Sequence, residues 1–167
     1  MAACRQDLRN NLMVSFLERK IPPPVLSLLT ALFMGALAYW DRAPLGLPWF
    51  GRSVMAGVIM AGAVAIFLYS GRQLFIAGTT WRPGDPSQTT SLVTNGLYCF
   101  SRNPIYLAWL LALTAWSLFL NDGLLLPLLP AFVLHMNRFQ IIPEERALET
   151  LFSDQYLSYK RRVRRWA

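Results

Sequence analysis

Charged residues are scarce in this chain, and their scarcity excludes an ordinary water-soluble domain. Only 15% of the 167 residues are charged, whereas 54% are hydrophobic; a typical soluble domain has roughly 25% charged residues. The apolar residues are also gathered into long runs, which a soluble enzyme of this size does not need. We therefore expect a single integral membrane domain of the all-α class, covering residues 1–167.

Cysteine and histidine are almost absent, which removes several kinds of reactive site. The two cysteines, Cys4 and Cys99, lie far apart and match no metal-ligand or redox spacing. His135 is the one histidine, and a role in helix packing is the simpler interpretation than a role as proton acceptor. The sequence therefore predicts no metal site.

The long apolar runs predict about four transmembrane helices arranged as a multi-pass bundle. Aromatic pairs at residues 39–40 and 49–50 flank the first two runs, as expected at a membrane interface. The last two runs are short and are joined by the turn at residues 121–123, so their helices must be antiparallel. The predicted helices cover residues 25–40, 53–76, 105–120 and 124–139.

Small residues recur four apart on the first two predicted helices. Ala31 and Gly35 form one such pair, and Gly57, Ala61 and Ala65 form a longer series. Small residues at this spacing let membrane helices approach closely. We expect both sets to face another helix.

Three polar segments complete the predicted architecture. Residues 1–24 are a charged segment expected in the headgroup layer, and residues 78–102 form one long loop. Pro143 is expected to start a C-terminal amphipathic helix with a basic end. Its expected apolar face consists of Leu148, Leu151, Phe152, Tyr156, Tyr159 and Val163.

The basic residues predict the orientation of the bundle. The net charge of +7 comes from residues at the ends of the apolar runs, which argues against a nucleic-acid partner. Only Arg42 and Arg52 fall on one side of the predicted membrane, and the other fourteen of the sixteen Lys and Arg residues fall opposite. We expect an inner-membrane protein with both termini cytoplasmic, so that the long loop and the C-terminal helix share one side.

Two polar blocks near the membrane are candidates for chemistry, because polar groups at membrane depth are usually paired or functional. The first spans residues 90–106 and the second spans residues 137–146. Gly96 is expected to supply an unusual backbone angle. Arg102 could pair with Glu144 or Glu145 and so simply lock the helices together.

The order and spacing of these blocks resemble one known family over residues 78–166. The chain resembles the isoprenylcysteine carboxyl methyltransferases and their bacterial relatives, within the wider group of integral membrane methyltransferases that includes phospholipid N-methyltransferases. The matching segments are Leu92-Val93-Thr94-Asn95-Gly96-Leu97-Tyr98, Arg102-Asn103-Pro104-Ile105-Tyr106, Glu144-Glu145-Arg146-Ala147-Leu148, and Phe152 with Tyr156, Tyr159 and Arg162-Val163.

The resemblance implies an S-adenosylmethionine-dependent methyltransferase, and it places the cofactor and catalytic part within residues 78–166. Its lipophilic acceptor would be the carboxylate of an isoprenylcysteine-like molecule or another hydrophobic small molecule or lipid. The cofactor-binding residues would be Thr90, Ser91, Leu92, Val93, Tyr98, Arg102, Asn103, Pro104, Ile105, Tyr106, Glu144 and Glu145. Of these, Arg102 and Glu145 are included for the chemistry of their side chains rather than for the family resemblance.

The candidate catalytic residues depart from the eukaryotic members of that family. Asn103 stands where those members have His, and an amide cannot titrate near neutral pH. Gln140 stands where they have Arg, while Arg138 lies two residues earlier. The acceptor therefore stays open between a carboxylate, a lipid amine and a thiol.

Two other functions compete with methyl transfer. One is a membrane reductase that uses a nicotinamide cofactor, because such enzymes share related C-terminal motifs. The other is a membrane scaffold without catalytic activity, in which the Arg and Glu residues only hold helices together. The small-residue faces fit helix contacts within one chain or between two chains.

Overall fold

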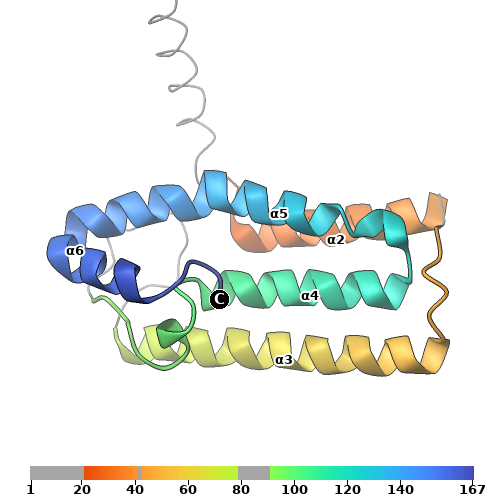
Figure 1. Cartoon of the computed structure of the whole chain (residues 1–167), viewed down its shortest axis with the longest axis horizontal. Helices are drawn as coiled ribbons and strands as arrows, with labels where there is room; N and C mark the ends of the chain where they lie inside the picture. The colour runs from red at the N-terminus through yellow and green to blue at the C-terminus, as the bar shows by residue number, and fades with distance from the viewer. Residues whose placement is uncertain (1–20, 41–42, 79–90) are drawn as a thin grey trace, which may run out of the picture.

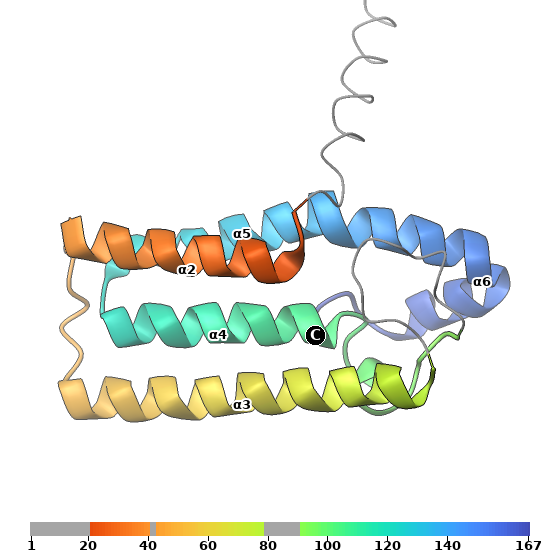
Figure 2. The same ribbon diagram turned by 180° about the vertical axis from the view of Figure 1, so that it is seen from behind.

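The computed structural model describes residues 21–40, 43–78 and 91–167. The predicted interfacial segment therefore lies mostly outside the described residues, as does Thr90. The α-helices are α2 (Pro23–Trp40), α3 (Trp49–Ile76), α4 (Pro104–Leu120), α5 (Leu128–Met136) and α6 (Ile142–Arg162), drawn in Figures 1 and 2. Shorter helical turns are η2 (Gly96–Cys99), η3 (Gly123–Leu125) and the π-turn η4 (Asn137–Ile141).

The fold is an all-α membrane bundle, as the composition predicts. Three stretches are long and apolar enough to cross a membrane: Pro23–Trp40, Trp49–Ile76 and Gly123–Arg162. The fourth apolar helix, α4, has 17 residues and packs along α3. Apolar side chains such as Leu32, Val58 and Leu68 face outward, where lipid can cover them.

Small side chains let α3 approach α4, but on a different face from the one predicted. The buried residues of α3 are Ala56, Ala63 and Ser70, spaced seven apart. The series Gly57, Ala61 and Ala65 is exposed in the single chain, so the helix contact expected of it stays a prediction. Several faces of α3 carry small residues, and only the position of the neighbouring helix selects one of them.

The predicted contact through Ala31 and Gly35 of α2 is confirmed. The Trp116 indole of α4 donates a hydrogen bond to the Ala31 carbonyl oxygen at 3.0 Å. A Cβ atom at Gly35 would lie 3.8 Å from the same indole ring. The small residues therefore admit a large aromatic side chain rather than a second helix backbone.

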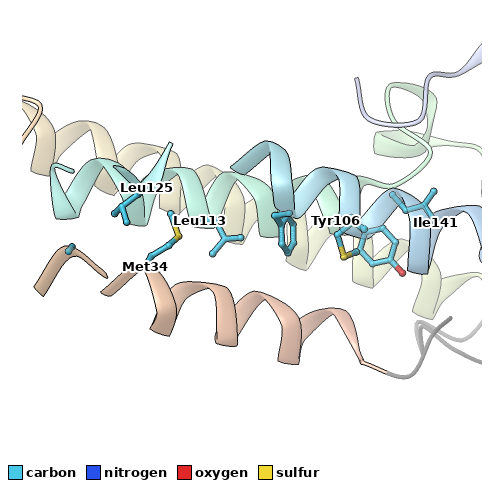
Figure 3. Packing of buried hydrophobic residues seen from close by; sticks show 8 residues of the cluster. Met34, Tyr106, Leu113, Leu125 and Ile141 are labelled. Atoms are coloured by element: carbon cyan, nitrogen blue, oxygen red, sulfur yellow. The ribbon is translucent and has the colours of Figure 1, made fainter. Parts of the chain in front are cut away.

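The buried core runs along the centre of the bundle, between α2, α4 and α5. Met34, Leu113 and Leu125 fill one end, and Tyr106 and Ile141 lie at the other (Figure 3). Each of these side chains is less than one-tenth exposed. The core thus extends to the end of the bundle where the polar residues gather.

The tight turn after α4 makes the hairpin that the sequence predicts. Asn121 adopts the left-handed conformation with φ of 57° and ends α4. Asp122 accepts hydrogen bonds from the backbone N–H of Leu124 at 2.9 Å and of Ala43 at 3.3 Å. The turn is thereby fastened to the connection between α2 and α3.

The segment from α5 to α6 corrects the predicted end of the fourth helix. Instead of a break before Pro143, the π-turn η4 joins α5 to α6, and the N–H of Ile142 bonds the Asn137 carbonyl oxygen. A proline in a helix clashes with the carbonyl group four residues back. The wider π-turn relieves that clash and lets the helix continue past Pro143.

A second correction concerns the apolar face predicted for the C-terminal helix. α6 bends at Ser153, which has φ of 42°, and its last part folds back toward the start of α4 (Figure 1). Tyr156 and Tyr159 are buried by this fold, whereas Leu151 stays exposed. The bend replaces the single lipid-facing stripe with a packed corner.

The polar parts of the chain that the structure describes after residue 90 therefore meet at one end of the bundle. Residues 91–103, α6 and the C-terminus lie together, and the α2–α3 connection and the α4–α5 turn lie at the opposite end (Figures 1 and 2). This arrangement brings residues far apart in sequence into one polar cluster.

Candidate functional site

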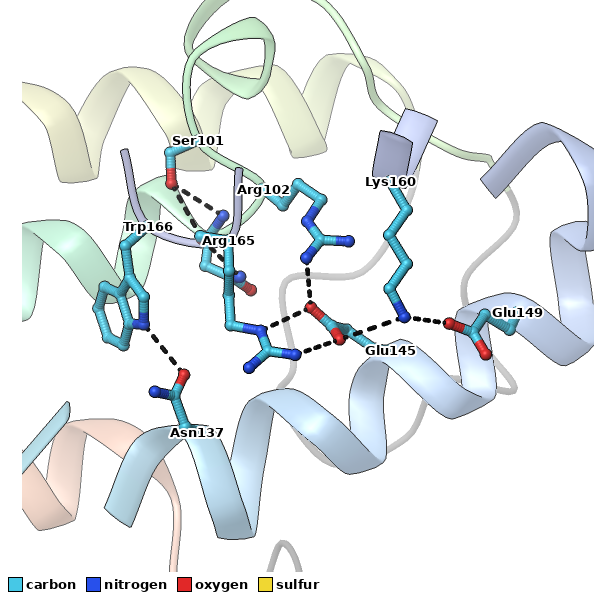
Figure 4. A network of polar contacts seen from close by, with 9 residues as sticks. Ser101, Arg102, Asn137, Glu145, Glu149, Lys160, Arg165 and Trp166 are labelled. Atoms are coloured by element: carbon cyan, nitrogen blue, oxygen red, sulfur yellow. Dashed lines mark hydrogen bonds and ion pairs between the residues drawn. The ribbon is translucent and has the colours of Figure 1, made fainter. Parts of the chain in front are cut away.

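Glu145 is the centre of the polar cluster at this end (Figure 4). Its carboxylate is 5% exposed. It pairs with Arg102 Nη2 at 2.9 Å and accepts from Arg165 Nε at 2.9 Å and Nη2 at 2.8 Å. Lys160 Nζ lies 3.7 Å away and also pairs with Glu149 at 2.6 Å. One buried carboxylate thus joins three separate segments of the chain.

Residues 163–166, which we call the C-terminal strap, close this cluster. The backbone N–H of Arg102 donates to the Arg164 carbonyl oxygen at 3.0 Å, and Asn103 Nδ2 donates to the Arg165 carbonyl oxygen at 2.9 Å. Trp166 Nε1 donates to Asn137 Oδ1 at 3.0 Å (Figure 4). The strap therefore ties the start of α4 to the π-turn.

Among the described residues of this region, two buried side chains have donor atoms without a hydrogen-bond partner. The Arg102 side chain is 7% exposed, and its Nε and Nη1 atoms are unpaired although Nη2 binds Glu145. Gln140, in the π-turn, is 3% exposed and its Nε2 atom is unpaired. A buried unsatisfied donor is unfavourable by about 1–3 kcal/mol, so both groups fit a site that receives an acceptor from outside the chain.

Tyr98, Tyr106 and Glu144 form a second part of the cluster. The Tyr106 hydroxyl donates to Glu144 Oε1 at 2.6 Å. Burial raises the pKa of Tyr98 well above its ordinary value, and the nearby Tyr159 and Glu144 raise it further. Tyr159 also donates its hydroxyl to the Tyr98 carbonyl oxygen at 2.7 Å. The Tyr98 phenol therefore keeps its proton at neutral pH and can donate a hydrogen bond.

Residues 91–95 lie beside the C-terminal end of α3 and border a separate hollow of about 530 Å³. Ser91 Oγ donates to the Ala77 carbonyl oxygen at 2.8 Å. The hollow is lined by Tyr69, Arg72, Gln73, Ile76, Ala77, Ser91, Leu92, Val93, Thr94 and Asn95. It contains none of the cluster residues, so the sequence-predicted cofactor residues fall in two places.

Gln73 of α3 fixes the path of the chain between these two places. Its Nε2 atom donates to the Asn95 carbonyl oxygen at 3.1 Å, and its Oε1 atom accepts from the Leu97 N–H at 3.2 Å. Between them, Gly96 has φ of 58°, which confirms the predicted unusual backbone angle. A Cβ atom at this position would overlap the Gln73 amide.

Replacing Gly96 by alanine is therefore expected to destabilise the protein by about 2 kcal/mol or more, because the left-handed angle alone is unfavourable by about 1–2 kcal/mol and the Gln73 hydrogen bonds are displaced. Thermal unfolding in detergent would measure the loss. Gly57→Ala is the matched control, because nothing lies within 4 Å of its new Cβ. An equal loss in both variants would contradict the proposed role of Gln73.

The structure brings most of the predicted site residues together. Arg102 pairs with Glu145, Tyr106 bonds the neighbouring Glu144, and Asn103 bonds the strap, all at the same end of the bundle. Pro104 is buried at the start of α4, and Ile105 packs on the core. Arg138 lies in the π-turn with its guanidinium 5.7 Å from the Phe139 ring centre.

Sequence reasoning missed the strap and the π-turn. The strap residues Arg165 and Trp166 lie in the basic end of the chain, and such a charge pattern is typical of a segment that contacts lipid. The sequence feature that could have indicated the strap is the single tryptophan after the run of arginines. The π-turn gives no periodicity of its own, although π-turns often occur at functional sites.

Comparison with known proteins gives a family and one relative. The phospholipid methyltransferase family matches residues 52–155, a segment that contains both polar blocks. An uncharacterized protein of Haemophilus influenzae is 47% identical over 62 residues, covering 37% of this chain and 98% of that protein. No solved structure matches.

Proposed function

This chain belongs to the phospholipid methyltransferase family of membrane methyltransferases, and we propose that it transfers a methyl group from S-adenosylmethionine to a lipophilic acceptor. The observation that carries the proposal is that the Tyr106–Glu144 hydrogen bond and the Arg102–Glu145 ion pair, made by adjacent residues of α6, lie at one end of the bundle inside the matched segment. These residues come from two different helices and a loop, and the fold brings them together.

The unpaired donors of Arg102 fit the carboxylate of the proposed cofactor. A guanidinium whose Nε and Nη1 atoms have no partner is suited to a carboxylate acceptor. Glu144, held by Tyr106, would accept from ribose hydroxyls or from an ammonium group. Tyr98 and Tyr106 would offer aromatic faces to a cation. When bound, the cofactor supplies a methyl group on a positively charged sulfur.

The residues of this chain would contribute position and exclusion of water rather than a strong base. Asn103 does not titrate near neutral pH and its amide donates to the strap. The raised pKa of Tyr98 keeps that phenol protonated. An acceptor that is already anionic needs no base, so alignment would provide most of the acceleration.

We propose that Arg138 and Gln140 contact the acceptor from the π-turn, and that Glu145 acts as a positioning residue for Arg102. Gln140 Nε2 is an unpaired buried donor, which suits an acceptor oxygen. The acceptor would enter from lipid, because the outward faces of the neighbouring helices are apolar. The excess of Lys and Arg at this end supports a cytoplasmic location for the site and both termini.

Ligand-dependent thermal stability separates this proposal from the reductase and scaffold alternatives. S-adenosylhomocysteine is expected to raise the unfolding temperature of the purified protein in detergent, and NADPH is expected to leave it unchanged. Stabilisation by NADPH alone would favour a reductase. No stabilisation by either compound would favour a scaffold.

A further inference from the structure

A second hollow lies at the opposite end of the bundle, far from the polar cluster. It has a volume of about 470 Å³ and lies where α2, α3 and the α4–α5 turn meet. Its lining includes Tyr39 and Gly35 from α2, Arg52 from α3 and Phe119 from α4. Nothing in the proposed methyl transfer uses this end of the molecule.

Arg52 is the basic residue that lines this hollow, and no described acidic residue forms an ion pair with it within 4 Å. Its guanidinium lies 4.8 Å from the centre of the Trp49 ring, and its Nε atom is buried without a hydrogen-bond partner. Arg52 also lies in the first turns of α3, where the helix dipole favours an anion. The structure therefore presents a donor, a positive charge and a helix N-terminus in one place.

Asp122 also borders the hollow, but its carboxylate is hydrogen-bonded to backbone groups at the α4–α5 turn. Its side chain is 2% exposed and accepts the backbone N–H groups of Leu124 and Ala43. Its charge is thus stabilised by the chain and turned away from solvent. A ligand in the hollow would therefore depend on Arg52, which is partly exposed, for its charged contact.

The surroundings of the hollow indicate that the ligand comes from the membrane. Tyr39, Trp40, Trp49 and Phe50 are exposed at this end, and such aromatic residues mark the level of the lipid headgroups. The hollow therefore lies at the depth where phosphate groups occur, with apolar helix faces below it for acyl chains.

We propose that this hollow binds the phosphate group of an anionic membrane phospholipid through Arg52. The bound lipid would brace α2 against α3 at this end of the bundle. It would stabilise the bundle without taking part in methyl transfer.

Lipid-dependent thermal stability of delipidated protein tests the proposal. Phosphatidylglycerol is expected to raise the unfolding temperature of the original protein more than phosphatidylcholine does, and Arg52→Gln should lose at least half of that difference. Arg161→Gln removes the same charge from an exposed site at the other end and should keep the difference. Inorganic phosphate alone should give no comparable stabilisation.

A second variant keeps the test decisive if Arg52→Gln does not fold. Tyr39→Ala would remove an exposed side chain that lines the hollow while keeping the Arg52 charge, and it should reduce the phosphatidylglycerol effect. The proposal is overturned if both variants respond to phosphatidylglycerol as the original protein does, or if inorganic phosphate stabilises equally well. Since cofactor binding is measured separately, failure here leaves the proposed function untouched.

Discussion

Replacing Glu145 by glutamine is expected to be among the most destabilising single substitutions in the chain. The carboxylate is buried and neutralises Arg102, whose side chain is 7% exposed, while also binding Arg165 and Lys160. Removing one partner of a buried ion pair leaves an uncompensated charge and is unfavourable by about 3–5 kcal/mol. For a chain of this size, that corresponds to a fall of roughly 10 °C in unfolding temperature.

Glu149→Gln is the matched control for this experiment. Glu149 lies on the same helix and binds Lys160 at 2.6 Å, but its side chain is 33% exposed. Exposed ion pairs contribute about 0–1 kcal/mol, so the control should unfold near the original temperature. Equal unfolding temperatures for the two variants, measured in one detergent, would show that Glu145 does not organise this end of the bundle.

Replacing Glu144 by glutamine is expected to weaken binding of S-adenosylhomocysteine by roughly 10-fold to 100-fold. The substitution keeps the shape of the side chain and removes its charge. A hydrogen bond to a charged group contributes about 1.5–3 kcal/mol, and the Tyr106 hydroxyl would lose its charged acceptor as well. Isothermal titration calorimetry in detergent would measure the change.

Two further variants show whether a change in affinity is specific to the Tyr106–Glu144 pair. Tyr106→Phe should weaken binding in the same direction, because it leaves Glu144 without the hydroxyl that holds it at 2.6 Å. Asp154→Asn removes a negative charge from an exposed position on the same helix and should leave affinity unchanged. If Glu144→Gln and Tyr106→Phe both bind as tightly as the original protein, the cofactor does not occupy this part of the cluster.

The membrane fold could be predicted because hydrophobic length and turn chemistry act locally. Residues 25–40 form α2 with two further residues at its start, and Pro104 begins α4 as its position before an apolar run predicts. A turn as short as the one at Asn121 makes the two helices that it joins antiparallel. These features depend on neighbouring residues only.

The details of helix packing could not be predicted, because they depend on which surfaces meet. Gly57, Ala61 and Ala65 have the spacing of a packing face, yet α4 lies against Ala56 and Ala63 instead. Ser153 has no sequence feature that demands a bend, and tertiary contacts of Tyr156 and Tyr159 hold it.

The sequence predicted which polar blocks would supply the candidate site, but it did not predict which of their residues pair with one another. The spacing of the polar blocks predicted an ion pair between Arg102 and either Glu144 or Glu145. In the structure the partner of Arg102 is Glu145. The sequence could not show that Glu145 is also held by Arg165, because that contact needs the bend at Ser153 and the course of the strap. Long-range geometry of this kind has no local signal.

Transfer of a labelled methyl group from S-adenosylmethionine to a membrane extract of the host is the most direct test of the central claim. Purified protein is expected to move label into a lipid-soluble product, and Glu144→Gln protein that is shown to be folded should move far less. Identification of the labelled product would give the acceptor. No label above background with the folded original protein, across extracts that contain lipid amines, carboxylates and thiols, would contradict the claim.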